Sequence, residues 1–279
     1  SVFLLDAKTI MPEKGTLNPD ETVSVHKYAE EVAEAAHLRS LGPAFKPGRV
    51  AEIAVDPTDR STWYLALGSG GLWKTTNRGN SWKPIFDEGG SYSLGHIAVD
   101  PRNPAVLWLG TGENISNRSV GYGDGIYKSN DGGETWTNVG LRDSQHIGKI
   151  IIHPRDSRVV YVAAEGPLWS AGGDRGLYKT VDGGLTWRAV LQISEDTGVT
   201  DMTMDPRDPN VIYASSYQRR RRVGQLIGGG PESANYQYTD VVHTSLTLTA
   251  VIPPVAMRRC ACSSFPIIPY IVVSLSTAV

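Results

Sequence analysis

A single eight-residue motif occurs three times in this chain, at intervals of about 50 residues. It reads Ser/Thr-x-Asp/Asn-x-Gly-x-Ser/Thr-Trp, and its copies occupy residues 75–82, 129–136 and 180–187. The acid or amide, the glycine and the tryptophan are its most distinctive positions: Asn77, Gly79 and Trp82; Asp131, Gly133 and Trp136; Asp182, Gly184 and Trp187. Self-similarity at a period of this length indicates a repeat architecture built from one supersecondary unit.

The motif has the chemistry of a tight turn. An Asp or Asn side chain accepts hydrogen bonds from nearby backbone N–H groups, and glycine takes up a positive φ. The Ser or Thr hydroxyls can close the same turn, and the tryptophan offers a large apolar face to a neighbouring unit. Because folding explains every position, we predict a structural role for the motif rather than a catalytic or metal-binding role.

Apolar runs between the motifs predict four short strands in each period. A first strand ends in Asp-Pro or His-Pro, as at residues 53–57 and 150–154, and a second strand follows a polar turn. A third strand leads into the motif, and a fourth begins at its tryptophan. Four-stranded units repeated radially form a β-propeller, whereas a sandwich needs no fixed period and a solenoid coil is shorter. We therefore predict an all-β fold of propeller blades, a partial ring with three to four blades visible.

Two segments fall outside the predicted blades, which span residues 41–234. Residues 1–40 form an N-terminal extension, in which helix formers and apolar residues at helical spacing predict a short helix over 26–38. Residues 235–279 differ in composition, and no fourth motif follows residue 234. We interpret this tail as truncated, frame-shifted or divergent. The alternative is a native tail whose residues 245–252 supply a replacement strand.

Charge and cysteine content argue against several kinds of site. A formal net charge of −2 and a pI near 6.3 lack the basic character of a nucleic-acid-binding protein. Cys260 and Cys262 have no cluster of His or Cys beside them, so no zinc site is predicted. We expect no metal and no cofactor.

Two further features bear on membranes and compartment. The apolar stretch 265–279 is interrupted by Pro266 and Pro269 and is shorter than the roughly 20 residues of a membrane-spanning helix. The N-terminus of this chain carries no signal-peptide pattern. We therefore expect no membrane span and leave the compartment open; a longer form with a leader upstream would be secreted or periplasmic.

The connections between strands fall on two faces of a propeller. Because neighbouring strands alternate in direction, the motif turns share one face, and the loops between second and third strands share the other. The motif turns are short, whereas these loops lengthen from residues 68–70 to 111–125 and 164–176. Long loops on a rigid scaffold commonly carry function, so we predict the functional face opposite the motifs.

Ten polar residues on that face are candidate binding residues. Two of them, Arg219 and Arg220, begin a run of four arginines in the fourth long loop, which is suited to a carboxylate or phosphate. The full set is Arg49, Glu113, Asn114, Arg118, Asp124, His146, Glu165, Arg175, Arg219 and Arg220. The simpler interpretation of each is a solvated loop residue, since loop side chains are mostly exposed. No catalytic residues can be identified.

The blade region resembles the BNR/Asp-box propellers, in particular the bacterial proteins described as sortilin (Vps10)-like or glycosyl-hydrolase-like. The resemblance covers roughly 190 residues, and it rests on the three motifs and on strings such as Ser69–Thr75, Gly110–Asn114, Tyr122–Gly125 and Gly228–Pro231. It implies a binding module that holds a protein or peptide on the face opposite the Asp boxes. The alternative is a glycoside hydrolase of sialidase-like or xyloglucanase-like fold, which needs facing carboxylates.

The expected partners follow from these interpretations. They are a protein, peptide or glycan ligand, with no nucleic acid and no membrane. An incomplete ring also exposes its ends, so we expect self-association through open blade edges.

Overall fold

The computed structural model describes residues 48–115, 120–239 and 242–248 of the chain. The helix predicted over residues 26–38, the candidate Arg118 and the segment 249–279 lie outside these ranges. Among the described residues, no helix is long and apolar enough to cross a membrane.

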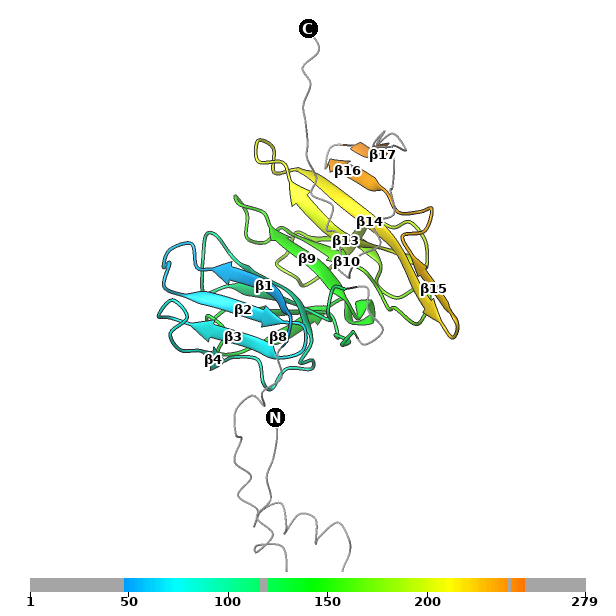
Figure 1. The fold of residues 1–279 in the computed structure, drawn as a ribbon. Helices are drawn as coiled ribbons and strands as arrows, with labels where there is room; N and C mark the ends of the chain where they lie inside the picture. The colour runs from blue at the N-terminus through cyan, green and yellow to red at the C-terminus, as the bar shows by residue number, and fades with distance from the viewer. Residues whose placement is uncertain (1–47, 116–119, 240–241, 249–279) are drawn as a thin grey trace, which may run out of the picture. The chain divides into compact units, whose positions relative to one another are not determined.

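The described chain folds into four antiparallel sheets that follow one another in sequence (Figure 1). Blade 1 consists of β1 (Val50–Val55), β2 (Trp63–Leu67), β3 (Gly71–Thr75) and β4 (Lys83–Pro84). Blade 2 consists of β5 (Leu94–Val99), β6 (Leu107–Thr111), β7 (Ile126–Ser129) and β8 (Thr137–Gly140). Blade 3 consists of β9 (Ile147–Ile152), β10 (Val160–Ala164), β11 (Gly176–Thr180) and β12 (Arg188–Leu191), preceded by the short 3-10 helix η1 (Arg142–Ser144). The prediction of all-β propeller blades is confirmed.

Blade 4 differs from the others in its second half. Its strands are β13 (Thr197–Met204), β14 (Val211–Arg222), β16 (Asn235–Thr239) and β17 (Val242–Leu248), with β15 (Gln225–Gly228) paired to the far end of β14. The sheet therefore continues beyond residue 234, into the segment that the sequence separates as a divergent tail. Strands β16 and β17 take the third and fourth positions, but the sequence between them contains no Asp box like those that join the third and fourth strands of the other blades. Whether the tail is frame-shifted or native stays a hypothesis.

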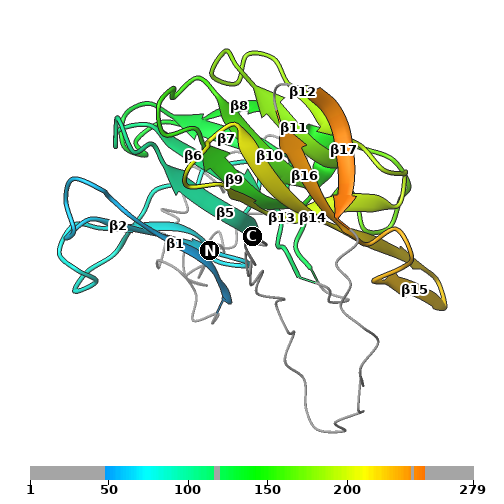
Figure 2. The same cartoon turned by 90° about the horizontal axis from the view of Figure 1, so that it is seen from above.

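The four blades contact one another in chain order through their first strands. Strand β1 lies against β5, β5 against β9, and β9 against β13, and Figure 2 shows the last three side by side. Alternate residues of each strand point to opposite faces of its sheet. The sheets of blades 2 and 3 therefore present one face to the preceding blade and the other to the following blade, and three apolar cores fill the spaces between the four blades.

Each first strand also contains a β-bulge, which the sequence does not predict. The pairing with the second strand shifts at residues 51, 95, 148 and 200. Two of these residues are glycines because the next blade approaches closely. A Cβ on Gly95 would lie 2.1 Å from the Ile147 carbonyl oxygen, and one on Gly148 would lie 2.2 Å from the Thr200 carbonyl oxygen.

Candidate functional site

The Asp-box turns are held by the same hydrogen bonds in each copy. In the second copy, Ser129 Oγ donates to Asp131 Oδ1 at 2.7 Å and accepts from the Gly133 N–H at 2.9 Å. Asp131 Oδ1 also accepts from the Thr135 N–H at 2.9 Å. The hydrogen bonds from Thr135 and Ser129 lower the pKa of the Asp131 carboxyl below its ordinary value. The carboxylate is thus occupied by its own turn, which accounts for its presence without any catalytic role.

The second and third Asp boxes also fasten their blades to the preceding ones. The Trp136 indole donates to the Ile85 carbonyl at 2.8 Å, and the Trp187 indole donates to the Val139 carbonyl at 2.7 Å. In return, a lysine from the third strand of the preceding blade reaches the box. Lys74 Nζ donates to the Gly132 carbonyl at 2.9 Å, and Lys128 Nζ donates to the Gly183 carbonyl at 3.0 Å. The same two contacts occur between blades 1 and 2 and between blades 2 and 3, so they serve to pack neighbouring blades together.

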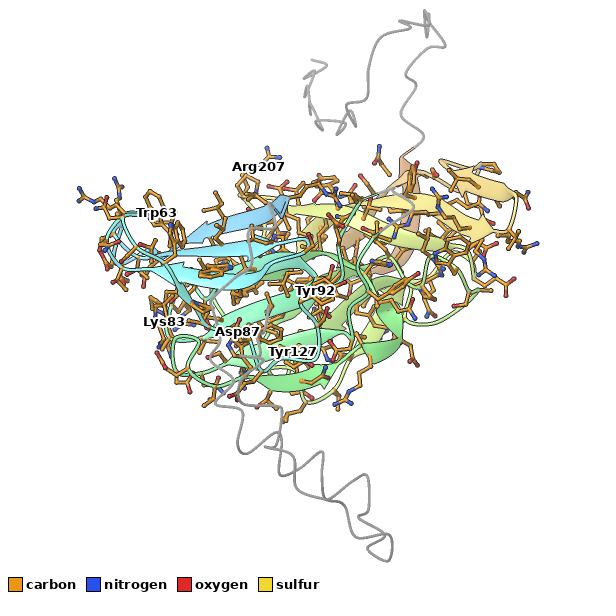
Figure 3. All side chains as sticks on the ribbon, turned by 60° about the horizontal axis from the view of Figure 1, so that its bottom comes forward. Trp63, Lys83, Asp87, Tyr92, Tyr127 and Arg207 are labelled. Carbon is orange, nitrogen blue, oxygen red and sulfur yellow. The ribbon has the colours of Figure 1, made fainter. Side chains whose placement is uncertain are left out.

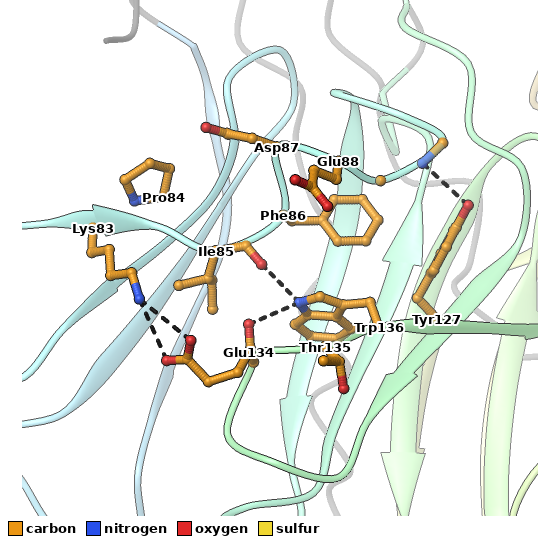
Figure 4. A pocket seen from close by; sticks show the side chains of 13 residues that line it. Lys83, Pro84, Ile85, Phe86, Asp87, Glu88, Tyr127, Glu134, Thr135 and Trp136 are labelled. Atoms are coloured by element: carbon orange, nitrogen blue, oxygen red, sulfur yellow. Dashed lines mark hydrogen bonds and ion pairs between the residues drawn. The ribbon is translucent and has the colours of Figure 1, made fainter. Parts of the chain in front are cut away.

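A groove of about 530 Å³ lies beside one of these contacts, between β4 and the second Asp box (Figure 4). Phe86 packs edge-on against Tyr127 and Trp136 in its wall, and Lys83 pairs with Glu134 at 3.4 Å. The charged side chains that line it are exposed, and the buried Tyr127 hydroxyl donates to Asp124. The groove belongs to the interface between blades, and the sequence does not predict it because its lining comes from two successive periods.

On the opposite face, the loop 111–115 reaches across the first strands of three other blades. Arg49 Nε lies 2.6 Å from Glu113 Oε1, and the Glu113 carboxylate is buried. Asn114 Nδ2 donates to the Thr200 carbonyl of β13 at 3.2 Å. His146 Nδ1 lies 3.0 Å from the Glu113 carbonyl oxygen. The structure therefore brings together four of the predicted candidates: Arg49, Glu113, Asn114 and His146.

His146 is buried beside a second group of candidates. Burial, with a further contribution from the Arg219 charge, lowers its pKa to about 3. The ring is therefore neutral at physiological pH, because a group loses its proton above its pKa. His146 can accept or donate a hydrogen bond here, but it does not supply a positive charge to a ligand.

The second group of candidates is a buried ion pair between blades 3 and 4. Glu165 Oε2 lies 2.9 Å from Arg219 Nη1, and both side chains are buried. Arg219 Nη1 also donates to the Ile115 carbonyl at 2.9 Å. Burial raises the pKa of the Glu165 carboxyl, while the charges of Arg219 and Arg175 act in the opposite direction. The pair joins the loop 164–176 to the hairpin of blade 4.

The run Arg219–Arg222 forms part of this hairpin and not an irregular loop. Strand β14 continues to Arg222 and pairs with β15, with Arg219 opposite Gly228 and Arg222 opposite Gln225. Arg220 Nη1 lies 3.5 Å from Asp196 Oδ1, and the Arg221 guanidinium lies 6.0 Å from the ring centre of Trp169. Most of the positive charge of the run therefore interacts with acidic or aromatic side chains of the protein itself.

The remaining described candidates stabilise loops. Arg175 donates to the carbonyls of Glu165, Pro167, Ser170 and Gly172, so it holds the loop 164–176 in its folded course. Asp124 Oδ2 accepts from the Tyr127 hydroxyl at 2.5 Å. Within the described ranges, no group of three His, Cys, Asp or Glu side chains is arranged to hold a metal ion.

Comparison with known proteins agrees with this architecture. The family model Sortilin-Vps10, described as sortilin, neurotensin receptor 3, matches residues 124–242. The chain is a BNR/Asp-box β-propeller protein. Two solved structures share its fold: an ancestral GH74 enzyme has a TM-score of 0.56 at 18% identity over 74% of this chain and 26% of that one. The GH74 enzyme of Niastella koreensis has a TM-score of 0.51 at 21% identity over 71% of this chain and 30% of that one.

Curated relatives of this Asp-box propeller include named enzymes. Xyloglucanase Xgh74A of Acetivibrio thermocellus is 28% identical over 175 residues, which is 50% of this chain and 20% of the relative. A probable oligoxyloglucan-reducing end-specific xyloglucanase of Neosartorya fischeri is 31% identical over 157 residues, 50% of this chain and 17% of the relative. The Asp-box propeller thus spans about a fifth of the length of the curated relatives it matches.

Exposed aromatic side chains are the feature of the loop face that the candidate set omits. The exposed fraction is 69% for Tyr92, 50% for Tyr122 and 44% for Trp169. All three lie in connections opposite the Asp boxes: Tyr92 between β4 and β5 (Figure 3), and the other two in the long loops of blades 2 and 3. Aromatic residues within Gly- and Ser-rich connections are the sequence signal that could have identified them.

Proposed function

We propose that this Asp-box propeller is a binding module that holds a protein or peptide on the face opposite the Asp boxes. The observation that carries the proposal is the contrast on that face between engaged charges and exposed aromatic rings. Tyr92, Tyr122 and Trp169 present large, rigid contact areas, and Tyr and Trp are enriched at the energetic centres of protein interfaces.

The three carboxylates of the candidate set, Glu113, Asp124 and Glu165, support binding over hydrolysis. A glycosidase places two carboxyl groups on either side of the scissile bond, about 5–10 Å apart, where both can reach the sugar. Glu113 is buried and paired with Arg49, and Glu165 is buried and paired with Arg219. Asp124 accepts from the Tyr127 hydroxyl. None of these three is available to a substrate without the loss of an internal contact.

A display library of random peptides, selected on the immobilised full chain, tests the proposal. Selected peptides should bind with an affinity that falls at least about tenfold in Trp169→Ala or Tyr122→Ala, because truncating a central aromatic typically costs about 2 kcal/mol or more and about 1.4 kcal/mol is tenfold. Leu185→Ala is the matched control, since Leu185 is an exposed apolar residue in the third Asp box. Selected peptides that bind all three variants equally would place their site elsewhere and contradict the proposal.

A glycoside hydrolase is the second candidate, because named xyloglucanases are among the relatives. Release of reducing sugar from xyloglucan by the full chain separates the two functions. The binding proposal expects no release above that of heat-denatured protein. Release that disappears in Glu113→Gln or Glu165→Gln would favour the hydrolase, provided that the variant keeps the melting temperature of the parent.

A further inference from the structure

The groove between blades 1 and 2 has acidic residues that the packing of blades does not require. The indole and lysine contacts that pack these blades occur in the same form between blades 2 and 3. Beside the groove, Asp87 and Glu88 occupy the fifth and sixth positions after the Asp-box tryptophan. The same positions hold Leu141 and Arg142 in blade 2, and residues 192–193 of blade 3 include no acid. The two acids are therefore particular to this interface.

A phenylalanine also replaces a glycine at this interface. Between blades 2 and 3 the backbone lies directly against the next indole, since a Cβ on Gly140 would be 3.1 Å from an atom of the Trp187 ring. Between blades 1 and 2, Phe86 takes the position of Gly140, and its ring centre lies 5.5 Å from that of Trp136. The Phe86 ring thus forms a wall of the groove, whose volume of about 530 Å³ lies within the range of about 300–1,000 Å³ typical of ligand sites.

The turn that carries the two acids is anchored at both ends. The Gly89 N–H donates to the Phe86 carbonyl at 3.1 Å, which closes a tight turn with the acids at its tip. The Phe86 ring is buried edge-on against Tyr127, and the Gly90 N–H donates to the Tyr127 hydroxyl at 3.2 Å. Blade 2 therefore holds the turn in place, and a group held in its binding position loses less conformational entropy when a ligand binds.

The lining of the groove carries three carboxylates and one ammonium group. Asp87 and Glu88 are exposed, and neither forms an ion pair with another residue in the described part of the chain. Glu134 pairs with Lys83 at 3.4 Å, and both of these side chains are exposed, so the pair is weak. Figure 4 shows Glu88 and Glu134 on opposite sides of the Trp136 indole. Negative charge therefore flanks a partly exposed aromatic ring.

This combination of charge and shape favours a basic ligand. A guanidinium group forms paired hydrogen bonds with a carboxylate and also stacks on an aromatic ring, and an ammonium group is attracted to both. The groove offers the carboxylates of Asp87 and Glu88 together with the partly exposed Trp136 ring. An acidic segment would meet like charge here, which disfavours it as a partner.

We propose that this groove binds a basic segment of a partner protein, with an arginine or lysine side chain seated between the turn 86–90 and the second Asp box. The groove lies beside β4, the outermost strand of blade 1, and it adds a second contact surface to the binding module. The proposal does not depend on the ligand held by the loop face, and its failure would leave the loop-face proposal unchanged.

Fluorescence polarisation with a fluorescein-labelled peptide of six arginines tests the proposal. We expect saturable binding to the full chain at about 0.15 M salt, where exposed charges more than about 8 Å apart are screened. Glu88→Lys should weaken binding at least about fivefold, which corresponds to about 1 kcal/mol. Glu195→Lys is the matched control, because Glu195 is an exposed acid in the connection between β12 and β13 and its replacement changes the net charge equally. The control should bind like the parent.

NMR spectroscopy of the labelled protein locates the bound peptide. The indole N–H signal of Trp136 should shift during the titration, whereas that of Trp187, at the matching place between blades 2 and 3, should stay unchanged. Glu88 is exposed, so Glu88→Lys should keep the melting temperature of the parent. Equal weakening by Glu88→Lys and Glu195→Lys would show a response to net charge alone and would overturn the proposal. An undiminished affinity of Glu88→Lys, an unshifted Trp136 signal or the lack of saturable binding by the parent would also overturn it.

Discussion

At the scale of single residues, the Asp box is a turn whose polar atoms satisfy one another. The Ser129 hydroxyl has the central place in the second box, because it donates to Asp131 and accepts from the buried N–H of Gly133. Thr75 and Thr180 make the equivalent contacts with Gly79 and Gly184. The motif therefore persists because a buried backbone donor needs a partner, and this need is independent of any ligand.

Replacement of Ser129 by alanine should destabilise the second box. The variant leaves the Gly133 N–H without its acceptor, and an unsatisfied buried donor costs about 1–3 kcal/mol. We expect the free energy of unfolding, measured by urea denaturation, to fall by that amount. Asn130→Ala, at the exposed neighbouring position, is the control and should change it little. Equal stability of the two variants would show that water or another group takes over the role of the hydroxyl.

At the scale of elements, the hairpin β14–β15 is attached to blade 3 by charge. Arg219 enters a buried pair with Glu165, and Arg220 faces Asp196. The backbone adds to this, since the Arg221 N–H donates to the Leu168 carbonyl at 2.8 Å. The arginine run therefore attaches the hairpin to blade 3, and the position of each arginine in the hairpin decides which guanidinium groups reach an acidic partner.

Breaking the buried pair should loosen this attachment strongly. Glu165→Ala leaves the Arg219 charge buried without its partner, which typically costs about 3–5 kcal/mol. Glu134→Ala removes one partner of an exposed pair with Lys83 and should cost no more than about 1 kcal/mol. Urea denaturation of both variants measures the difference. A double variant, Glu165→Leu with Arg219→Met, should recover most of the lost free energy of unfolding. If the double variant stayed as unstable as Glu165→Ala, the buried ion pair would not be the source of the loss.

The sequence predicts the blades well because each period contains everything that its sheet requires. The second strand of blade 1, β2, and the three Asp boxes could be placed from spacing and turn residues alone. The second half of the fourth blade could not, since β16 follows an Arg- and Gly-rich stretch with the composition of a loop, and no Asp box follows β16. The pairs Arg49 with Glu113 and Glu165 with Arg219 join separate periods, and no local pattern encodes which loops meet.

At the scale of the whole molecule, the blades depend on one another through the bulges of their first strands. The bulge residue Gly148 lies against the backbone of Thr200 in the next blade. A side chain at position 148 would therefore clash with the next blade and not with its own sheet. Gly95 is in the same position between blades 2 and 3, against Ile147. The stability of the four blades therefore depends on close backbone contacts between blades 2 and 3 and between blades 3 and 4, and each of these contacts requires a glycine.

A methyl group at this contact should weaken the whole array. In Gly148→Ala the new Cβ would meet the Thr200 carbonyl oxygen at 2.2 Å, and backbone cannot turn away as a side chain can. We expect a loss of about 1–3 kcal/mol, as for other overpacked sites, together with faster amide hydrogen exchange in both β9 and β13. Gly48→Ala is the matched control, because its Cβ would have no neighbour closer than 3.4 Å. If exchange increased in β9 alone, the bulge would act within blade 3 and the coupling between blades would have another origin.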